Sequence, residues 1–408
     1  MSEQRHRPLD GIRVISFGAF VAGNTAGCLL AELGADVVKV EPRARPEVLR
    51  TPAYAIGPTF TEPSGVPQTI MYGTLSRGTR SLSMDLRTEA ARPAFHELAR
   101  RADVVVENVG GASLARWGCS FEDLVVDNPR LVWLSLSGYG RTGPAARYLA
   151  YAANISGYVG LTSLWGHAAG TLSDYVTAAT GVVGTIAALA QVERTGAAVY
   201  VDAAQIDAMT QLMAPELLDP LVNGCDPPYE VNHVPGSWLS GAFPALGVDA
   251  WVAIEIEDAE DWSVLCHLLG RSDLETVDEA VAAGCRKEIE TALVAWLAER
   301  SPHSATHLLQ KAGLAAGAVQ DAEDVWRDPQ LRSRGFMVER YQPDYGVLQY
   351  PNSVQRLSRT AGHLDRAGPR LGQHTYEIMR EWAGTGDAEL EALTASGAIF
   401  QAAEQPRG

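Results

Sequence analysis

A strand, a helix and a second strand follow one another within residues 12–42, and this pattern constrains the fold more than any other feature. Residues 12–20, IRVISFGAF, are β-branched and apolar and then reach glycine, which is typical of a buried strand. Residues 23–35, GNTAGCLLAELGA, carry leucines on one helical stripe, and residues 36–42, DVVKVEP, form the next strand. Strands joined through a helix lie parallel with a right-handed crossover, so the segment predicts a parallel sheet.

The same alternation continues to about residue 209. Further strands are expected in RSLSMDL, DVVVEN, RLVWLSLSGYG and AAVYVDAA, and helices at 89–101 and roughly 175–194. Alternating strands and helices predict an α/β fold with a Rossmann-like, doubly wound parallel sheet in a large domain.

A chain of 408 residues is too long for one hydrophobic core to be the default, so we expect two domains. The large domain is predicted to span 1–215. A stretch rich in Pro, Gly and Asn at 216–240 has the composition of a connector. Residues 241–325 read as a smaller α+β domain, and 326–408 as a return segment that completes the large domain.

Composition narrows the function classes. The formal charge of −16 argues against general nucleic-acid binding, which needs a basic face. No uninterrupted apolar run reaches the roughly 18 residues of a membrane span, and the first residues show no apolar signal core, so a cytoplasmic protein is expected. The five cysteines are scattered and the nine histidines do not cluster, which predicts no metal site.

The first strand–helix turn contains Gly18, Gly23 and Gly27, which invites comparison with a dinucleotide-binding turn. Their spacing is GxxxxGxxxG instead of GxGxxG, although Glu41 ends the next strand where a ribose-binding acid could lie. The spacing therefore favours a tight turn with close helix packing over a nucleotide site.

Asp174 stands out in GTLSDYVTAATG, between a Gly-rich approach and a long helix of small residues. Aspartate is a favoured N-cap, so an ordinary capping role is one interpretation. A carboxylate at a helix start also lies beside unpaired backbone N–H groups that stabilise developing negative charge, so a catalytic role is the other. The two interpretations are compatible.

Five blocks of sequence resemble the family III CoA-transferases, the relatives of formyl-CoA transferase and carnitine CoA-transferase, which include α-methylacyl-CoA racemase. The blocks occur in the family's order and cover nearly the whole chain: PLDGIRVISFGAFVAGNTAGCLLAELGADVVKVEP, RSLSMDLRTEAARPAFHELARRADVVVENVGGASLARWG, NPRLVWLSLSGYGRTGP, DAEDVWRDPQLRSRGF and PRLGQHTYEIM. The resemblance implies a CoA-transferase that moves CoA between carboxylic acids.

The resemblance also implies roles for individual residues. Asp174 occupies the position of the family's nucleophilic aspartate, which forms a mixed anhydride and then an aspartyl-CoA thioester. Coenzyme A, as the acyl-CoA co-substrate, is expected to contact five residues: Arg116, Asn108, Val109, Arg80 and Arg43. The acyl group is expected beside Tyr151, Tyr139 and Val21.

Two other functions remain open within this resemblance. In the racemase branch a histidine partners the aspartate, but Tyr151 stands at that position here, and a phenol is a poor base near neutral pH. His167 is a possible alternative base. A non-catalytic acyl-CoA-binding relative is the third possibility. The family architecture further implies a homodimer of two interlocked chains, with acyl-CoA and a carboxylic acid as the small-molecule partners and with no nucleic acid or membrane.

Overall fold

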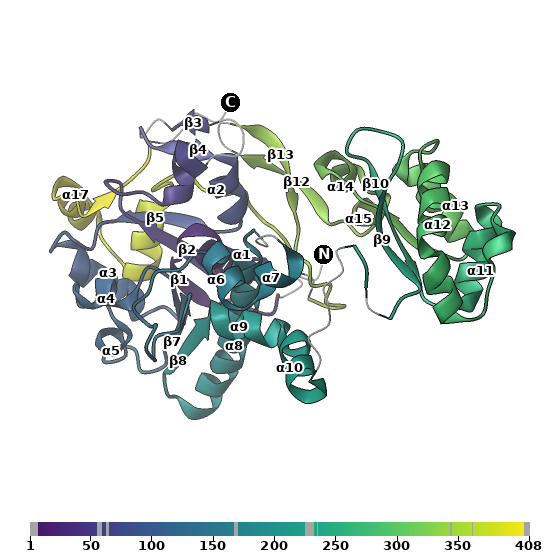
Figure 1. The fold of residues 1–408 in the computed structure, drawn as a ribbon. Coiled ribbons are helices and arrows are strands. Elements are labelled where there is room, and N and C mark those ends of the chain that lie inside the picture. The colour runs from purple at the N-terminus through teal and green to yellow at the C-terminus, as the bar shows by residue number, and fades with distance from the viewer. Residues whose placement is uncertain are drawn as a thin grey trace. The chain divides into compact units, whose positions relative to one another are not determined.

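The computed structural model describes residues 7–54, 59–62, 65–166, 170–224, 232–234, 236–342, 345–360 and 362–403. The chain divides into two compact units (Figure 1). The larger unit comprises residues 1–224 and 332–408, and the smaller unit comprises residues 225–331. The candidate functional residues lie in the larger unit, and each unit is described by itself.

A parallel sheet forms the centre of the larger unit. Among the described residues, seven strands are joined in the order β14-β5-β2-β1-β6-β7-β8, and only β14 runs antiparallel to its neighbour. The strands are β1 (Arg13–Phe17), β2 (Asp36–Glu41), β5 (Arg80–Met84), β6 (Val104–Glu107), β7 (Val132–Ser137), β8 (Val199–Ala204) and β14 (Ile399–Phe400). The prediction of an α/β fold with a doubly wound parallel sheet is confirmed.

Both faces of this sheet are covered, so consecutive strand residues enter different cores. Val14 of β1 and Val132 of β7 pack with α1 (Phe20–Glu32) and α8 (Leu172–Thr195). Their neighbours Ile15 and Trp133 pack on the opposite face. That face is covered by α3 (Ala91–Ala99), α5 (Phe121–Leu124), α16 (Thr375–Ile378), the π-helical turn Met379–Ala383 and α17 (Asp387–Ala395).

The strand order reverses between β1 and β6, which are neighbours although the chain runs from β1 outward to β2 first. In open parallel sheets, the crevice outside the carboxyl ends of the strands at such a reversal is the usual ligand site. Here those ends lead into the turn that starts α1 and into residues 108–110, which precede α4 (Gly111–Ala115). The topology therefore indicates a ligand site at this edge of the sheet.

Further elements surround this edge. They are α6 (Ala152–Tyr158), α7 (Leu161–Trp165), α9 (Gln205–Leu212) and α10 (Ala214–Asn223) after β7 and β8. Between β2 and β5 lie two short 3-10 turns (Val48–Arg50 and Pro52–Tyr54), β3 (Thr59–Thr61), β4 (Pro67–Thr69) and α2 (Ile70–Leu75). The hairpin of β12 (Met337–Gln342) and β13 (Gly346–Pro351) also belongs to the larger unit.

The smaller unit is an antiparallel three-stranded sheet with helices on it (Figure 1). Its strands are β9 (Leu239–Pro244), β10 (Trp251–Ile256) and β11 (Ala315–Ala318). Its helices are α11 (Ala259–Leu268), a 3-10 turn (Ser272–Leu274), α12 (Glu279–Leu297), α13 (Pro302–Lys311), α14 (Ala322–Arg327) and the start of α15 (Pro329–Ser333). Trp262, Ile289 and Leu309 are fully buried in its core.

α8 is long and apolar enough to span a membrane by length and composition alone. It packs instead against α1, α9, β7 and β8, as a core helix of a covered sheet does. Small residues allow this contact: a Cβ atom on Gly181 would lie 3.0 Å from the Leu136 side chain. The helix thus serves as a layer of the larger unit.

The glycines of α1 differ in what they contact. A Cβ atom on Gly23 would lie 2.5 Å from the Cα of Gly18 and 2.6 Å from Oδ1 of Asn108, whereas one on Gly27 would meet ordinary contacts at 3.6 Å and beyond. Glu41 is buried and is bonded to Arg50 at 2.8 Å, so it is committed to an internal ion pair. These contacts agree with the tight-turn interpretation of the glycines.

We therefore predict opposite effects of two alanine substitutions in one helix. Gly23→Ala should lower the free energy of unfolding by about 1–3 kcal/mol, because the backbone of the turn has to move. Gly27→Ala should leave it unchanged or raise it by up to about 1 kcal/mol, because alanine favours the helix. Urea unfolding of both variants measures this, and equal effects would contradict the packing described here.

Candidate functional site

Asp174 lies in the first turn of α8, at its third residue. The helix begins at Leu172, three residues earlier than the sequence indicated, and its N-cap is Thr171, which makes no side-chain capping bond. Asp174 is therefore not the N-cap, and the capping interpretation is wrong. Its backbone N–H donates to the carbonyl of Thr171 at 3.1 Å, while its side chain contacts other helices.

Two groups from two different helices hold the Asp174 carboxylate. Nε2 of Gln205, the first residue of α9, donates to Oδ1 of Asp174 at 2.8 Å. The amide oxygen of Gln205 accepts a bond from the Ser173 hydroxyl at 3.1 Å, which fixes the orientation of the amide. The backbone N–H of Ala22, in the first turn of α1, also lies close enough to the carboxylate to lower its pKa.

The environment of Asp174 favours a partly desolvated carboxylate. Burial raises the pKa of Asp174 above its ordinary value, and the bonds from Gln205 and Ala22 oppose this rise without cancelling it. A less solvated carboxylate with a raised pKa is a better nucleophile than a fully hydrated one when it is ionised. The site thus has the chemical character that attack on a carbonyl requires.

The Phe20 N–H, the first of α1, donates to the Glu47 carboxylate at 2.9 Å, so the backbone donors that α1 can offer to this site are the N–H groups that follow it. The N-cap of α1 is Ala19, which has no side-chain capping bond, and the first N–H groups of a helix have no partner within the helix. One of these donors, from Ala22, already reaches Asp174. An oxyanion that forms at the acylated Asp174 would meet the positive end of α1.

Three residues proposed for CoA follow β6. Arg116 is exposed at the end of α4, where Nη2 donates to the Ser113 hydroxyl at 3.2 Å, and Val109 is 43% exposed. Asn108 differs, because its side-chain amide is paired with the backbone of Ala19 at 2.6 and 2.7 Å. Arg116 and Val109 can be reached by a ligand, whereas the Asn108 amide holds the turn before α1.

The other two arginines proposed for CoA lie elsewhere in the larger unit. Arg43 is exposed, and its guanidinium lies 4.3 Å from the ring centre of Phe400. Arg80 is buried and bonded to three carboxylates, those of Asp36, Glu377 and Glu381, at 2.6–2.8 Å. Its charge is already neutralised, so the geometry gives Arg80 a structural role that joins β5 to β2 and the C-terminal helices.

Aromatic side chains gather near the carboxyl ends of β1 and β7. Tyr151 is 60% exposed and its ring makes an edge contact with Phe20 at 5.9 Å, next to the first turn of α1. Tyr139 makes edge contacts with Tyr148 and Tyr158. Val21 is instead buried in a small core with Leu49, Tyr72 and Leu75, so its side chain is not at an open surface.

The sequence did not single out Gln205 or Ala22 as site residues. Gln205 is 31 positions from Asp174, and no local pattern joins them. The signal that could have found it is topological, because Gln205 directly follows β8 and the carboxyl ends of parallel strands meet at one edge. His167, considered above as a possible base, lies outside the described residues.

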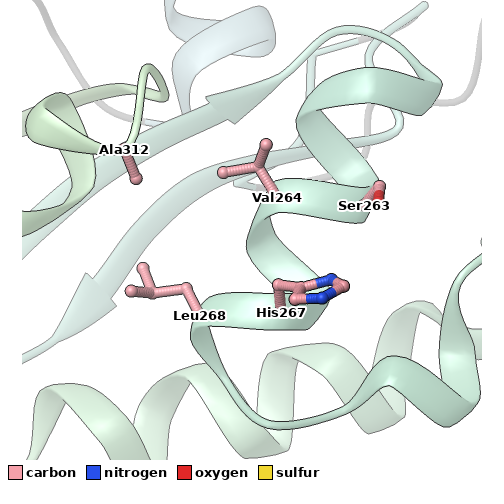
Figure 2. Close-up of a pocket in the computed structure, with 5 residues that line it drawn as sticks. All are labelled: Ser263, Val264, His267, Leu268 and Ala312. Atoms are coloured by element: carbon pink, nitrogen blue, oxygen red, sulfur yellow. The ribbon is translucent and has the colours of Figure 1, made fainter.

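The smaller unit contains a separate open pocket of about 400 Å³ on α11 (Figure 2). Val264 and Leu268 point toward Ala312 there, and Ser263 and His267 complete the lining. Nδ1 of His267 and the Ser263 hydroxyl both bond to Glu275, at 2.8 and 3.3 Å. Because the hydroxyl donates to the carboxylate and not to the imidazole, this group is not arranged to activate Ser263 as a nucleophile.

No group of three or more metal-ligating side chains occurs in the described parts of the chain. The candidate site combines a carboxylate, the N-terminus of α1 and exposed basic and aromatic side chains. Covalent chemistry of the carboxylate is the reaction that this set of residues can support.

Comparison with known proteins agrees with this site. Residues 9–375 match the model of CoA-transferase family III, so the chain belongs to that family. Relatives include succinyl-CoA–D-citramalate CoA-transferase of Chloroflexus aurantiacus, 28% identical over 98% of this chain and 100% of the relative. Succinate–glutarate CoA-transferase of Agrobacterium fabrum is 29% identical over 92% of this chain and 96% of the relative. The protein is a CoA-transferase.

Solved structures show the same fold. A CaiB/BaiF family protein from Brucella suis superimposes with a TM-score of 0.81 at 28% identity, over 92% of this chain and 100% of that one. A variant of Rv3272 from Mycobacterium tuberculosis, in which an aspartate is replaced by alanine, gives a TM-score of 0.72 at 26% identity, over 92% of this chain and 99% of that one.

The raised pKa of Asp174 predicts that its charge destabilises the fold. Burial makes the pKa of this carboxyl higher in the folded than in the unfolded state. The free energy of unfolding of the protein therefore falls as the pH rises through the window between the two pKa values. Asp174→Asn should therefore have a higher free energy of unfolding than the wild type at pH 7, with a smaller difference at acid pH. Urea unfolding at both pH values measures this. A difference that grows on acidification would contradict the assignment.

Proposed function

We propose that this CoA-transferase moves CoA from an acyl-CoA to a free carboxylic acid through covalent intermediates on Asp174. The observation that carries the proposal is the contact of this partly buried carboxylate with Gln205 and with the N-terminus of α1. Chemical activation at the aspartate conserves the thioester energy, because water is not a reactant at any step.

The proposed transfer of CoA takes four steps. The Asp174 carboxylate attacks the thioester carbonyl, the C–S bond breaks, and CoA thiolate leaves behind a mixed anhydride. The thiolate then attacks the aspartyl carbonyl, which releases the donor acid and leaves an aspartyl-CoA thioester. The acceptor carboxylate attacks this thioester and forms a second anhydride with release of thiolate. Attack of the thiolate on the acceptor carbonyl yields the new acyl-CoA and free Asp174.

Residues of this chain stabilise these steps. Each attack at the aspartyl carbonyl places negative charge on its oxygen, where the Ala22 N–H and the Gln205 amide are already aimed. Arg116, with its forked guanidinium, is suited to a CoA phosphate, and Val109 offers exposed surface beside it. Tyr151 and Tyr139 are proposed to border the acyl group.

Succinyl-CoA is the first donor to test, because the names of several relatives specify it or succinate. Incubation with succinyl-CoA followed by hydroxylamine should convert Asp174 to a hydroxamate, detected by mass spectrometry of its peptide. Asp174→Ala should abolish trapping and lower the transfer rate by roughly 10⁴-fold or more, as losses of catalytic nucleophiles do.

Asp258→Ala is the matched control, because Asp258 starts a helix in the smaller unit and caps it with bonds to Glu260 and Asp261. This variant should lose about 1 kcal/mol of stability and retain transfer. Transfer at the wild-type rate in Asp174→Ala would contradict the proposal. Exchange of the α-proton of a 2-methylacyl-CoA without trapping would instead indicate racemase chemistry.

We further propose that the enzyme is a homodimer, as the family resemblance implies, with interlocked chains. α10 has no buried residue, and Leu218, Leu221 and Val222 are 55%, 81% and 76% exposed. On α8, Val183 is 68% exposed. Exposed apolar side chains of this kind on α8 and α10 favour burial against a second copy of the chain.

Light scattering after gel filtration should give twice the mass of the chain. Val222→Glu should raise the dissociation constant of the dimer by about tenfold or more, because a buried charge is costly at such an interface. Val126→Glu is the control, since Val126 is 80% exposed but is not on α8 or α10. A monomeric wild type would contradict the dimer.

A further inference from the structure

Side chains hold every backbone polar group of residues 18–20, the segment that leads from β1 into the first residue of α1. Gly18, Ala19 and Phe20 have three N–H and three C=O groups, and each of the six bonds to a side chain. Irregular turns usually satisfy such groups with water or with nearby backbone. This turn is therefore fixed from several directions before the first N–H groups of α1.

Asn108 makes the most direct of these contacts. Its Oδ1 accepts from the Ala19 N–H at 2.6 Å and its Nδ2 donates to the Ala19 carbonyl at 2.7 Å, a two-point match between an amide and a peptide unit. Asn108 follows β6, so these bonds join the two strand ends at which the sheet order reverses. Close packing of Gly23 against both Gly18 and Asn108 leaves the arrangement little freedom.

Three further buried polar side chains contribute to the hydrogen bonds around this turn. Lys39, at β2, donates to the Gly18 carbonyl and to Oδ1 of Asn24. Nδ2 of Asn24 donates to the Phe20 carbonyl at 2.6 Å, and Glu47 accepts from the Phe20 N–H at 2.9 Å. All three are less than 10% exposed, at 2%, 3% and 7%.

Phe20 explains why such support is needed. Its φ is +51°, a conformation that costs a non-glycine residue of order 1–2 kcal/mol. The Phe20 N–H donates to Glu47 and the Phe20 carbonyl accepts from Asn24, and these two bonds stabilise the positive φ of this residue. The strained residue is also the first of α1, so its conformation sets the direction in which the following N–H groups point.

We propose that Asn108, with Lys39, Asn24 and Glu47, positions the N-terminus of α1 so that the Ala22 N–H is aimed at the reacting carboxyl of Asp174. These are positioning residues, because they act on the reaction through the turn and α1. The inference rests on the proposed function and adds the part of the fold that controls transition-state stabilisation.

Such positioning affects the chemical step more than substrate binding. The negative charge on the aspartyl oxygen exists only during attack, so a displaced donor lowers kcat while KM for the thioester stays nearly constant. A displacement of about 1 Å at a reacting centre costs up to roughly 100-fold in rate.

The pH profile provides a readout that a purely structural role would not change. The Ala22 bond lowers the pKa of Asp174, so its loss should move the acid limb of kcat to higher pH. The other groups that act on the carboxyl are Gln205 on α9 and Tyr175 on α8. Arg77 and Cys28 act in turn on Tyr175.

The test compares Asn108→Ala with Asn128→Ala. Asn128 is a matched control: it is buried, and its amide donates to two backbone carbonyls, Ala99 and Ala102, at 3.0 and 2.7 Å. Asn108→Ala should lower kcat by about 10- to 100-fold with KM within about twofold, and should shift the acid limb upward. Asn128→Ala should lower stability but leave kcat and the acid limb unchanged.

A second pair of variants leaves Asn108 unchanged, so its result does not depend on whether Asn108 also contacts CoA. Glu47→Ala removes the acceptor of the Phe20 N–H and should reproduce the loss of kcat, whereas Glu47→Gln keeps an acceptor oxygen and should restore most of it. This pair decides the question if Asn108→Ala does not fold.

Unchanged kcat and acid limb in Asn108→Ala, or a rise in KM alone, would overturn the inference. So would equal activity of the two Glu47 variants. If Asp174→Ala is inactive and Asp174 is trapped in the wild type, such a result removes only the positioning role. If Asp174→Ala is fully active, the proposed function itself fails.

Discussion

The contact between the Asp174 carboxylate and the N-terminus of α1 is the interaction on which the site depends. It joins two helices whose starting points are about 150 positions apart in sequence, at one edge of a parallel sheet. Burial weakens the solvation of the carboxylate, and the Ala22 N–H and Gln205 amide replace part of the lost water. In the proposed mechanism, the attacking carboxylate and the donors for its oxyanion would thus come from the same packing.

The close approach of α1 to the sheet makes this contact possible. Gly18 and Gly23 touch where any Cβ atom would clash, so the first turn of α1 lies directly over the end of β1. The same glycines suggested a nucleotide-binding turn by their position after a strand. In the structure they serve helix packing, and Glu41, the acid that could have bound ribose, is paired internally with Arg50.

The sheet could be predicted from local patterns, and Asp174 could be singled out as the nucleophile candidate because its local setting was combined with the family resemblance. Strand residues such as Val14 and Ile15 alternate between two cores, and the strands alternate with helices, which fixes a parallel arrangement. Asp174 was found by its place before a helix of small residues, although the helix begins earlier, at Leu172, and makes Asp174 part of its first turn.

The partners of these residues could not be predicted, because they are set by tertiary contacts. Gln205 reaches Asp174 only since β8 ends beside α8. The family resemblance implied that Arg80 contacts CoA, yet Asp36, Glu377 and Glu381 surround its guanidinium, and two of these acids come from the far end of the chain. Likewise, nothing local showed that the Asn108 amide would pair with Ala19.

The transfer of oxygen from the acceptor acid to Asp174 tests most directly whether the reaction passes through an aspartyl intermediate. If an acceptor acid labelled with oxygen-18 in its carboxylate attacks an aspartyl thioester, one labelled oxygen stays on the aspartate when the new thioester forms. Mass spectrometry after turnover should find oxygen-18 in the peptide that contains Asp174 and in no other peptide. An unlabelled Asp174 after many turnovers, with all of the label in the acceptor acid and its thioester and none in the released donor acid, would contradict the account.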